Sequence, residues 1–403
     1  MDQASRLLLP ALPLCLAATA AAAQTVPAPL TPYADLRYRV EVVDQAGLPE
    51  DAVASTLRVR AGVRTAEWQG FSAVAEGEAI AVIGSATYND TVNGKTAYPV
   101  VADPADVLLN QAYLRWRPHQ AVEAVAGRQA VNFDNQRWIG SVGWRQNDQT
   151  LDAARASLRP VKAASVDYLY AWRVNRVFGP DSPQGIWRDT AIHAVRAGYT
   201  IKNVGTLTGY GYWLDTPSSP ASSSQTTGVR IAGELPAARG FAFLYAAEYA
   251  RQQDHGSNPR SFALDYLLLE PGVKAGPVTL KAGLERLEGD GTVALQTPLA
   301  TLHAFNGWAD KFLTTPANGL RDVYLDAAWK VPGKGPLAGL TLRAVWHDYR
   351  STVGDVAYGQ EWNGLVSYPL GKRFTVSAKL ARYEAKAFAT DTTKGWLSLE
   401  ARF

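Results

Sequence analysis

Residues 57–64 read LRVRAGVR, and this short run decides the fold class. Its apolar and basic side chains alternate, with Leu57, Val59 and Val63 on one face and Arg58, Arg60 and Arg64 on the other. Successive side chains of a β-strand point to opposite faces of the sheet, so this strand has one apolar face and one charged face. Because arginine keeps its charge at any working pH, the charged face must meet water or carboxylates.

The same two-residue period recurs along most of the chain, and no helical period of 3.6 residues is sustained after residue 23. The other alternating segments are 36–42, 71–79, 112–117, 166–175, 229–234, 241–249, 262–268, 278–286, 323–331, 340–346, 362–368, 374–380 and 397–403. Short connections alternate with long ones, and the long ones are 84–106, 131–147, 178–189, 215–225 and 289–319. Outer-membrane barrels show this asymmetry between periplasmic turns and outer loops.

Composition narrows the class of protein further. The formal net charge of +3 over 403 residues gives no case for nucleic-acid binding. No apolar run after residue 23 reaches the roughly 18 residues that a membrane helix needs, and a membrane protein built from strands must close into a barrel. We therefore predict an all-β fold, a transmembrane antiparallel β-barrel of about 18 strands around a water-filled lumen. The alternatives are a soluble sandwich, propeller or β-helix, but neither a propeller-length repeat nor a sandwich-length domain boundary is found.

The two ends of the chain indicate export to the outer membrane of a Gram-negative bacterium. Residues 1–23 begin with a short polar segment, continue as an apolar stretch and end in Ala21-Ala22-Ala23, which predicts a secretory signal peptide cleaved near Ala23. Residues 24–403 would form one barrel domain in contact with outer-membrane lipid. Cys15 is the only cysteine, so the exported chain needs no disulfide. Phe403 extends the apolar face of the last strand and is expected to engage the barrel-assembly machinery.

Arginine is concentrated in residues 127–159, GRQAVNFDNQRWIGSVGWRQNDQTLDAARASLR, which contain no lysine and no glutamate. Two alternating segments flank a polar middle, which predicts strand, long loop and strand. Inward arginines here and on neighbouring strands would attract anions. These candidate pore-lining residues are Arg58, Arg60, Arg64, Arg115, Arg117, Arg128, Arg137, Arg145 and Arg155. Glu76 and Glu78 would brace the same wall through ion pairs, and the alternative is an ordinary solvated wall of weak pairs.

Two long loops are candidates for narrowing the lumen. The loop 131–147 carries arginines together with Trp138 and Trp144, and we expect it to fold into the lumen rather than to lie on the surface. The loop 289–319 carries Phe305, Trp308 and Phe312 among polar residues. These aromatic rings could stack on sugars, or they could simply pack the loop against the rim of the barrel.

Catalysis has little support in the sequence, and neither a cofactor nor a metal is expected. The five histidines are scattered, and none lies in a metal-binding spacing or a G-x-S-x-G context. A barrel enzyme acting on outer-membrane lipid would need a serine and a histidine on its lipid-facing side. His193 is on such a face, but no serine partner follows from the pattern.

Several segments resemble the alginate-export-type family of outer-membrane barrels. They are the arginine-rich stretch above, AVAEGEA (73–79), LNQAYLRWRP (109–118), LKAGLERLEGDG (280–291) and QTPLATLHAFNGWADKFLTTPANGLRDVYLDAAW (296–329). The resemblance implies a monomeric 18-stranded pore whose arginine-rich constriction passes an anionic polysaccharide. The turn at 369–373 is too short for the periplasmic plug of that family, so a porin for small solutes, with or without anion preference, is the alternative.

Overall fold

The computed structural model describes residues 29–403, so the signal-peptide prediction lies outside the described part of the chain. The first strands in chain order are β1 (Leu30–Gln45), β2 (Ala52–Thr65), β3 (Phe71–Thr87), β4 (Asp106–His119), β5 (Val122–Gln129), β6 (Thr150–Val161), β7 (Ala164–Asn175), β8 (Ile186–Trp187), β9 (Ala191–Ile201) and β10 (Gly205–Asp215). The others are β11 (Ser224–Ala238), β12 (Phe241–Asp254), β13 (Ala263–Ala275), β14 (Val278–Leu287), β15 (Leu320–Lys330), β16 (Thr341–Arg350), β17 (Ala357–Leu370), β18 (Phe374–Ala385) and β19 (Thr392–Arg402).

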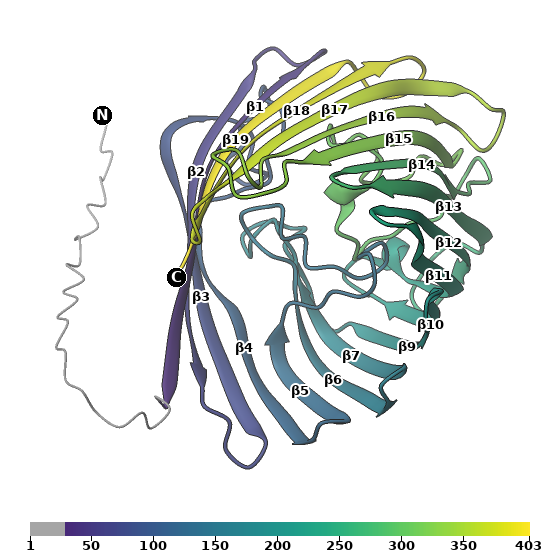
Figure 1. The fold of residues 1–403 in the computed structure, drawn as a ribbon. Helices are drawn as coiled ribbons and strands as arrows, with labels where there is room; N and C mark the ends of the chain where they lie inside the picture. Colours follow the sequence, from purple (N-terminus) through teal and green to yellow (C-terminus); the bar gives the residue numbers. More distant parts are fainter. Residues whose placement is uncertain (1–28) are drawn as a thin grey trace.

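The strands form one closed antiparallel barrel (Figure 1). Each long strand pairs with its neighbours in the chain, and β19 pairs with β1 along Asp35–Gln45 to close the sheet. The two-residue strand β8 pairs only with the end of β7, so the barrel itself has 18 strands. The predicted fold class and strand number are confirmed. Within residues 29–403 no helix is both long and apolar enough to span a bilayer.

The two faces of β1 show why this sequence closes into a barrel with a polar interior. Arg39 and Glu41 are buried within the lumen, whereas Tyr38 and Val42 on the opposite face are 38% and 44% exposed. The same division holds for outward leucines on other strands, namely Leu114, Leu207, Leu325, Leu380, Leu397 and Leu399. An apolar exterior is stable only against lipid, and a closed sheet leaves no unpaired strand edge in the membrane.

Connections differ sharply between the two ends of the barrel. At one end the turns are short, and the β2–β3 turn shows a glycine that it requires. Gly70 has φ +81°, and a Cβ there would lie 2.6 Å from the carbonyl oxygen of Arg117. The other end carries the longest connections, and several of them turn back into the barrel (Figure 1). The long connections of such barrels lie on the extracellular side.

The hydrophobic core of the molecule lies inside the barrel, around two of these inward segments. We call them the β5–β6 loop (residues 130–149) and the β14–β15 loop (residues 288–319). Ile139 and Phe133 of the first loop and Leu299 and Phe312 of the second belong to one buried cluster. The same cluster includes luminal side chains of the strands, such as Tyr266. The loops are therefore packed parts of the interior.

Candidate pore constriction

The β5–β6 loop crosses the lumen and is held at both walls. On the β1 side, the Arg37 guanidinium donates to the carbonyl oxygens of Gly143 (2.9 Å), Trp144 (3.0 Å) and Arg145 (3.1 Å). Arg39 also donates to the Trp144 carbonyl. Charge-assisted bonds of this kind satisfy loop carbonyls that would otherwise be buried without a donor.

On the opposite wall, buried carboxylates receive donors from the same loop. The indole Nε1 of Trp138 donates to Oε1 of Glu248 on β12 at 2.6 Å. The guanidinium Nε of Arg137 lies 2.9 Å from Oε1 of Glu285 on β14. Trp138 thus donates a hydrogen bond to its carboxylate, and Arg137 forms an ion pair with its own. Removing either side chain would leave a buried carboxylate with fewer partners, which is costly. The sequence prediction that this loop enters the lumen therefore agrees with the geometry.

The β14–β15 loop meets the β5–β6 loop inside the barrel. Ile139 and Leu299 form a parallel β-bridge, and the Gly140 N–H donates to the Leu299 carbonyl at 2.9 Å. Beyond this contact the β14–β15 loop reaches β17, where the Ala309 N–H donates to Oε1 of Glu361 at 2.9 Å. The two loops together form an internal partition across the lumen.

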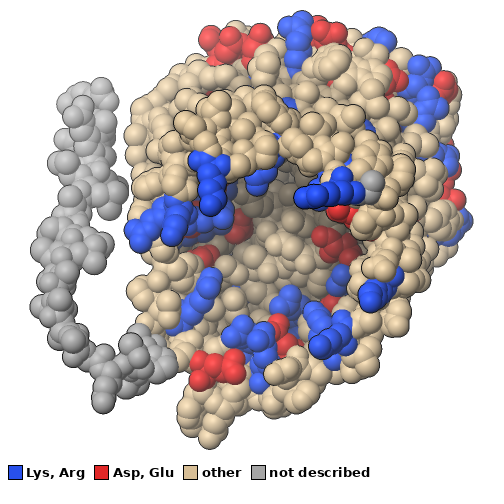
Figure 2. Space-filling view, viewed as in Figure 1, with Lys and Arg blue, Asp and Glu red and all other residues tan. Residues whose placement is uncertain are grey.

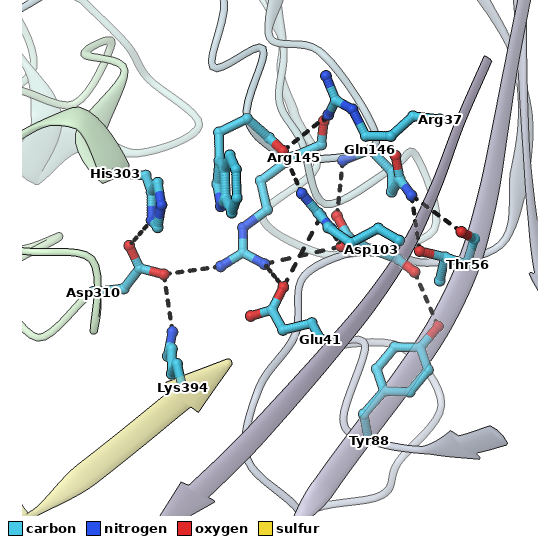
Figure 3. A network of polar contacts seen from close by, with 12 residues as sticks. Arg37, Glu41, Thr56, Tyr88, Asp103, Arg145, Gln146, His303, Asp310 and Lys394 are labelled. Carbon is cyan, nitrogen blue, oxygen red and sulfur yellow. Dashed lines mark hydrogen bonds and ion pairs between the residues drawn. The ribbon is translucent and has the colours of Figure 1, made fainter. Parts of the chain in front are cut away.

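An ion network holds the centre of this partition (Figure 3). Arg145 reaches Oε2 of Glu41 at 3.2 Å and Oδ2 of Asp310 at 3.0 Å, while Asp103 pairs with Arg39. Nζ of Lys394 lies 2.9 Å from the same Asp310 oxygen. Burial opposes charge on Asp310, but Lys394 and its other donors hold its pKa well below the usual range. Burial likewise lowers the pKa of Arg145, yet its carboxylate partners raise it overall.

His303 connects this network to an aromatic cluster. Its Nδ1 lies 2.7 Å from Oδ1 of Asp310, and its Nε2 lies 2.7 Å from Nζ of Lys379. Burial lowers the pKa of His303 to about 3, so the ring is neutral at pH 7 and Nε2 accepts from the ammonium. The ring stacks on Trp144 at 4.4 Å, and Nζ of Lys379 lies 3.7 Å from the Trp144 centroid and 4.0 Å from that of Trp308. The rings of Trp144 and Trp308 are thus occupied by a cation of the protein itself.

Four of the predicted pore-lining arginines are buried in ion pairs. Arg58 pairs with Asp35, and Arg60 pairs with Glu78 directly across the β2–β3 ladder. Arg137 and Arg145 bind the carboxylates described above. Glu76 faces Gly62 instead of an arginine, and it accepts from the side-chain amides of two β4 residues, Asn110 (2.7 Å) and Gln111 (3.1 Å). These groups hold the walls and loops together and offer little free charge to a solute.

Another four predicted arginines remain partly open to the lumen. Arg64 is exposed and lies 4.5 Å over the ring of Tyr33. The side chains of Arg115, Arg117 and Arg155 are 35%, 43% and 26% exposed, toward the short-turn half of their strands. Figure 2 shows a hollowed face with basic and acidic side chains around it and within it. These arginines, rather than the buried set, can meet a mobile solute.

The prediction that Arg128 lines the pore is wrong. Within the unbroken β5–β6 ladder, Val125 and Gln129 are buried inside, whereas Arg128 shares the other face with its partner Asp152. That face also carries Leu158, which is 45% exposed. Nε of Arg128 donates to Oδ1 of Asp152 at 2.7 Å. The pair lies next to the end of β5, on the long-loop side of the barrel.

Several central residues were missed by sequence reasoning. Arg37, Arg39 and Glu41 stand in an alternating segment, LRYRVEV, that carries the same signal as Arg58 and Arg60. By contrast, Asp103 and Asp310 lie in loops without periodicity, and nothing local marks them. His193 is on the outer wall, where its Nδ1 lies 2.9 Å from the Tyr168 hydroxyl, and no serine within residues 29–403 bonds to it. No group of three or more potential metal-ligating side chains is found in that same part of the chain.

Small cavities lie on both sides of the partition. On its short-turn side a cavity of about 240 Å³ is lined by Glu270, Lys281 and Arg343. On its long-loop side two cavities, of about 410 Å³ and about 450 Å³, lie among the outer connections. The first of these reaches Arg145, Asp310 and Lys311. Residues of both loops line the cavity of about 240 Å³ and the cavity of about 410 Å³, so a solute that crosses the barrel must pass beside the two loops.

Several solved structures have a similar fold, and one of them is described as the outer membrane protein OpdK of Pseudomonas aeruginosa. The crystal structure of Pseudomonas aeruginosa OpdL is 14% identical, with a TM-score of 0.71 over 93% of this chain and 98% of that chain. OpdK with vanillate, from the same organism, is 14% identical, with a TM-score of 0.71 over 92% and 98%. Acinetobacter baumannii OccAB3 is 12% identical, with a TM-score of 0.73 over 93% and 99%. At these identities the likeness shows the barrel fold.

Sequence comparison gives the family. No curated protein matches the chain, and the resemblance to alginate exporters receives no support from any of these comparisons. A family model described as Gram-negative porin matches residues 11–387, which is nearly the whole chain. Membership implies an outer-membrane channel. The chain belongs to the Gram-negative porin family.

Proposed function

We propose that this protein is a diffusion porin for small polar solutes, with a preference for those that carry negative charge. The observation that carries the proposal is the meeting of the β5–β6 and β14–β15 loops inside the lumen through the Ile139–Leu299 bridge. A polysaccharide needs a continuous open path, whereas cavities of about 240 to 450 Å³ on the two sides of a partition fit single small molecules. The size of the solute is therefore set by the loops.

Charge on the short-turn half of the lumen supports the anion preference. Five arginines of this wall, Arg64, Arg115, Arg117, Arg155 and Arg159, are at least partly exposed. Their carboxylate partners are Glu67, Glu123 and Asp167. Five positive charges thus oppose three negative ones, and solvated pairs of this kind bind weakly. The remaining positive potential raises the local concentration of anions.

The similar porin OpdK was crystallised with vanillate, which is a small aromatic carboxylate. A solute of that size and charge suits the passage described here. This parallel supports the proposal.

Two measurements on purified protein test the proposal. Uptake into proteoliposomes should be rapid for a monosaccharide, slow for a trisaccharide and absent for an oligouronate of ten residues. Reversal potentials in a salt gradient should indicate anion preference, and Arg115→Gln with Arg117→Gln should reduce it. Arg128→Gln removes the same type of charge from the outer wall and is the matched control. Passage of the decamer, or cation preference in the unmodified protein, would contradict the proposal.

A further inference from the structure

The cavity of about 450 Å³ has a composition unlike the constriction. It lies among four long connections: residues 176–190, 216–223 and 255–262, and the β14–β15 loop. Half of its lining residues are Ser, Thr, Asn or Gln, and none of the residues described as lining it is Asp or Glu. Its only charged lining residues are Arg176 and Arg260. Such a surface offers many neutral hydrogen-bonding groups together with positive charge that no lining carboxylate offsets.

Arg176 is held in position without a carboxylate partner. Its guanidinium carbon lies 4.6 Å from the Trp187 ring centroid and 5.0 Å from that of Phe178. Within residues 29–403 its side chain makes no ion pair or hydrogen bond, and its Nε is buried without a partner. Burial alone lowers the pKa of Arg176 to about 10, which still leaves it charged at neutral pH. The aromatic rings fix the plane of the guanidinium, but they leave its hydrogen-bonding capacity unused.

Arg260 adds a second positive charge on the same cavity. Its Nη1 donates to the Thr292 carbonyl at 2.8 Å, and it forms no ion pair with a described residue. A solvated loop surface normally pairs its arginines with nearby carboxylates, as Arg350 and Asp355 do at 2.9 Å on the outer wall. Two arginines without carboxylates, around one partly open polar cavity, point to an anionic ligand as their partner.

We propose that this cavity binds a mono- or disaccharide bearing one carboxylate or phosphate group, with the anionic group on Arg176. Guanidinium forks match both anions, while the hydroxyl and amide side chains match sugar hydroxyls. The volume falls within the range of about 300–1,000 Å³ typical of small-ligand sites. The proposal rests on the proposed porin function in one respect, which is that the sugar enters from the long-loop side.

The cavity also lies on the path toward the constriction. It shares Arg176, Leu302 and Leu313 with the neighbouring cavity of about 410 Å³, which reaches Arg145 and Lys311. A sugar held at Arg176 therefore occupies the entrance to the narrow passage and reduces ion flow while it is bound. Binding and transient current block are two readouts of the same event.

The test uses single-channel recording and calorimetry on the full-length barrel. Glucuronate and glucose 6-phosphate, added to the long-loop side, separate the carboxylate and phosphate sources. Glucose tests the need for charge, and acetate tests the need for the sugar. One or both anionic sugars should bind and block the current at concentrations at least tenfold lower than glucose or acetate, because an added charge-assisted hydrogen bond typically contributes this factor or more.

Arg176→Gln should weaken that binding about tenfold or more, while the channel still opens and conducts ions in salt alone. Arg188→Gln, in the same connection but away from the cavity lining, is the matched control and should bind like the unmodified protein. Equal binding of glucose, acetate and the anionic sugars, or full binding by Arg176→Gln, would overturn the proposal. Loss of ion conductance in the unmodified barrel would instead refute the porin function.

Discussion

Arg37→Gln is the most informative single change in the constriction. The substitution removes three hydrogen bonds from the guanidinium to the β5–β6 loop carbonyls, at 2.9, 3.0 and 3.1 Å, and an ion pair with Glu400 at 3.0 Å. Hydrogen bonds to charged groups contribute about 1.5–3 kcal/mol each, but bonds that share one guanidinium are not additive. We take about 3 kcal/mol as a lower estimate for the whole set.

That free energy predicts a change that is easy to measure. Since each 1.4 kcal/mol is a factor of ten, the population with the loop displaced should rise about 100-fold. Single-channel recordings should show correspondingly more frequent transitions to a state of higher conductance. The barrel itself should remain intact, because its strands are joined by backbone hydrogen bonds that the substitution does not touch.

Arg117→Gln is the matched control for this experiment. It removes the same charge from the lumen, but Arg117 pairs with Glu123 near the short turns and does not contact the loop. The control should alter ion selectivity slightly and leave the transition frequency unchanged. The account of loop anchoring is refuted if Arg37→Gln gates like the unmodified protein, or if Arg117→Gln gates like Arg37→Gln.

Three further predictions concern His303, Trp138 and Arg128. The pKa of about 3 for the packed His303 lies below the value of 6.5 for an unperturbed histidine. A proton therefore binds more tightly when the loop is displaced. Between pH 6.5 and pH 3, each fall of one pH unit destabilises the packed state by about 1.4 kcal/mol. Recordings at pH 7 and 4.5 should show the transitions rising in the unmodified channel but much less in His303→Gln, in which the groups facing the ring (Asp310, Lys379 and Arg145) remain. Trp138→Phe removes the hydrogen bond to Glu248, but that carboxylate keeps its hydrogen bonds from Tyr210 and Arg230. We therefore expect the packed state of the β5–β6 loop to lose about 1–2 kcal/mol of stability. Faster protease cleavage of residues 130–149 would report this loss. Arg128→Gln should leave the reversal potential unchanged, and a shift as large as that of Arg115→Gln would contradict its placement on the outer wall.

The barrel fold was predictable because the environment that imposes it, lipid outside and water inside, acts on every residue of every strand. Lipid on one side and water on the other impose a two-residue period, and LRVRAGVR displays that period without reference to any distant contact. Closure through β1 and β19 then follows, since no strand edge can remain open in the membrane. The packing inside the barrel was not predictable in this way, because it depends on contacts between residues far apart in the sequence. Arg37 and Trp144 meet across 107 positions, and no local pattern encodes their contact.

The arginines show how a correct pattern can still mislead. The prediction placed Arg128 in the pore because of its charge alone. The face on which a strand residue lies depends on whether it is an even or an odd number of positions from an inward residue. Arg128 is an odd number of positions from the inward Val125 and Gln129, so it lies on the outer face. For Arg58 and Arg145 the inward direction was right, yet neither is free for a solute. Their partners, Asp35 and Asp310, lie 23 and 165 positions away in the sequence. The sequence therefore shows the arginines but not the carboxylates that neutralise their charge.

The central claim is that two loops folded into the barrel set the width of the pore. The most direct test replaces residues 134–146 with a short Gly-Ser linker and measures single-channel conductance, with circular dichroism to verify that the barrel is retained. The account predicts a severalfold higher conductance and faster passage of the trisaccharide, which the unmodified protein passes slowly. An intact barrel with unchanged conductance and unchanged solute cut-off would contradict it.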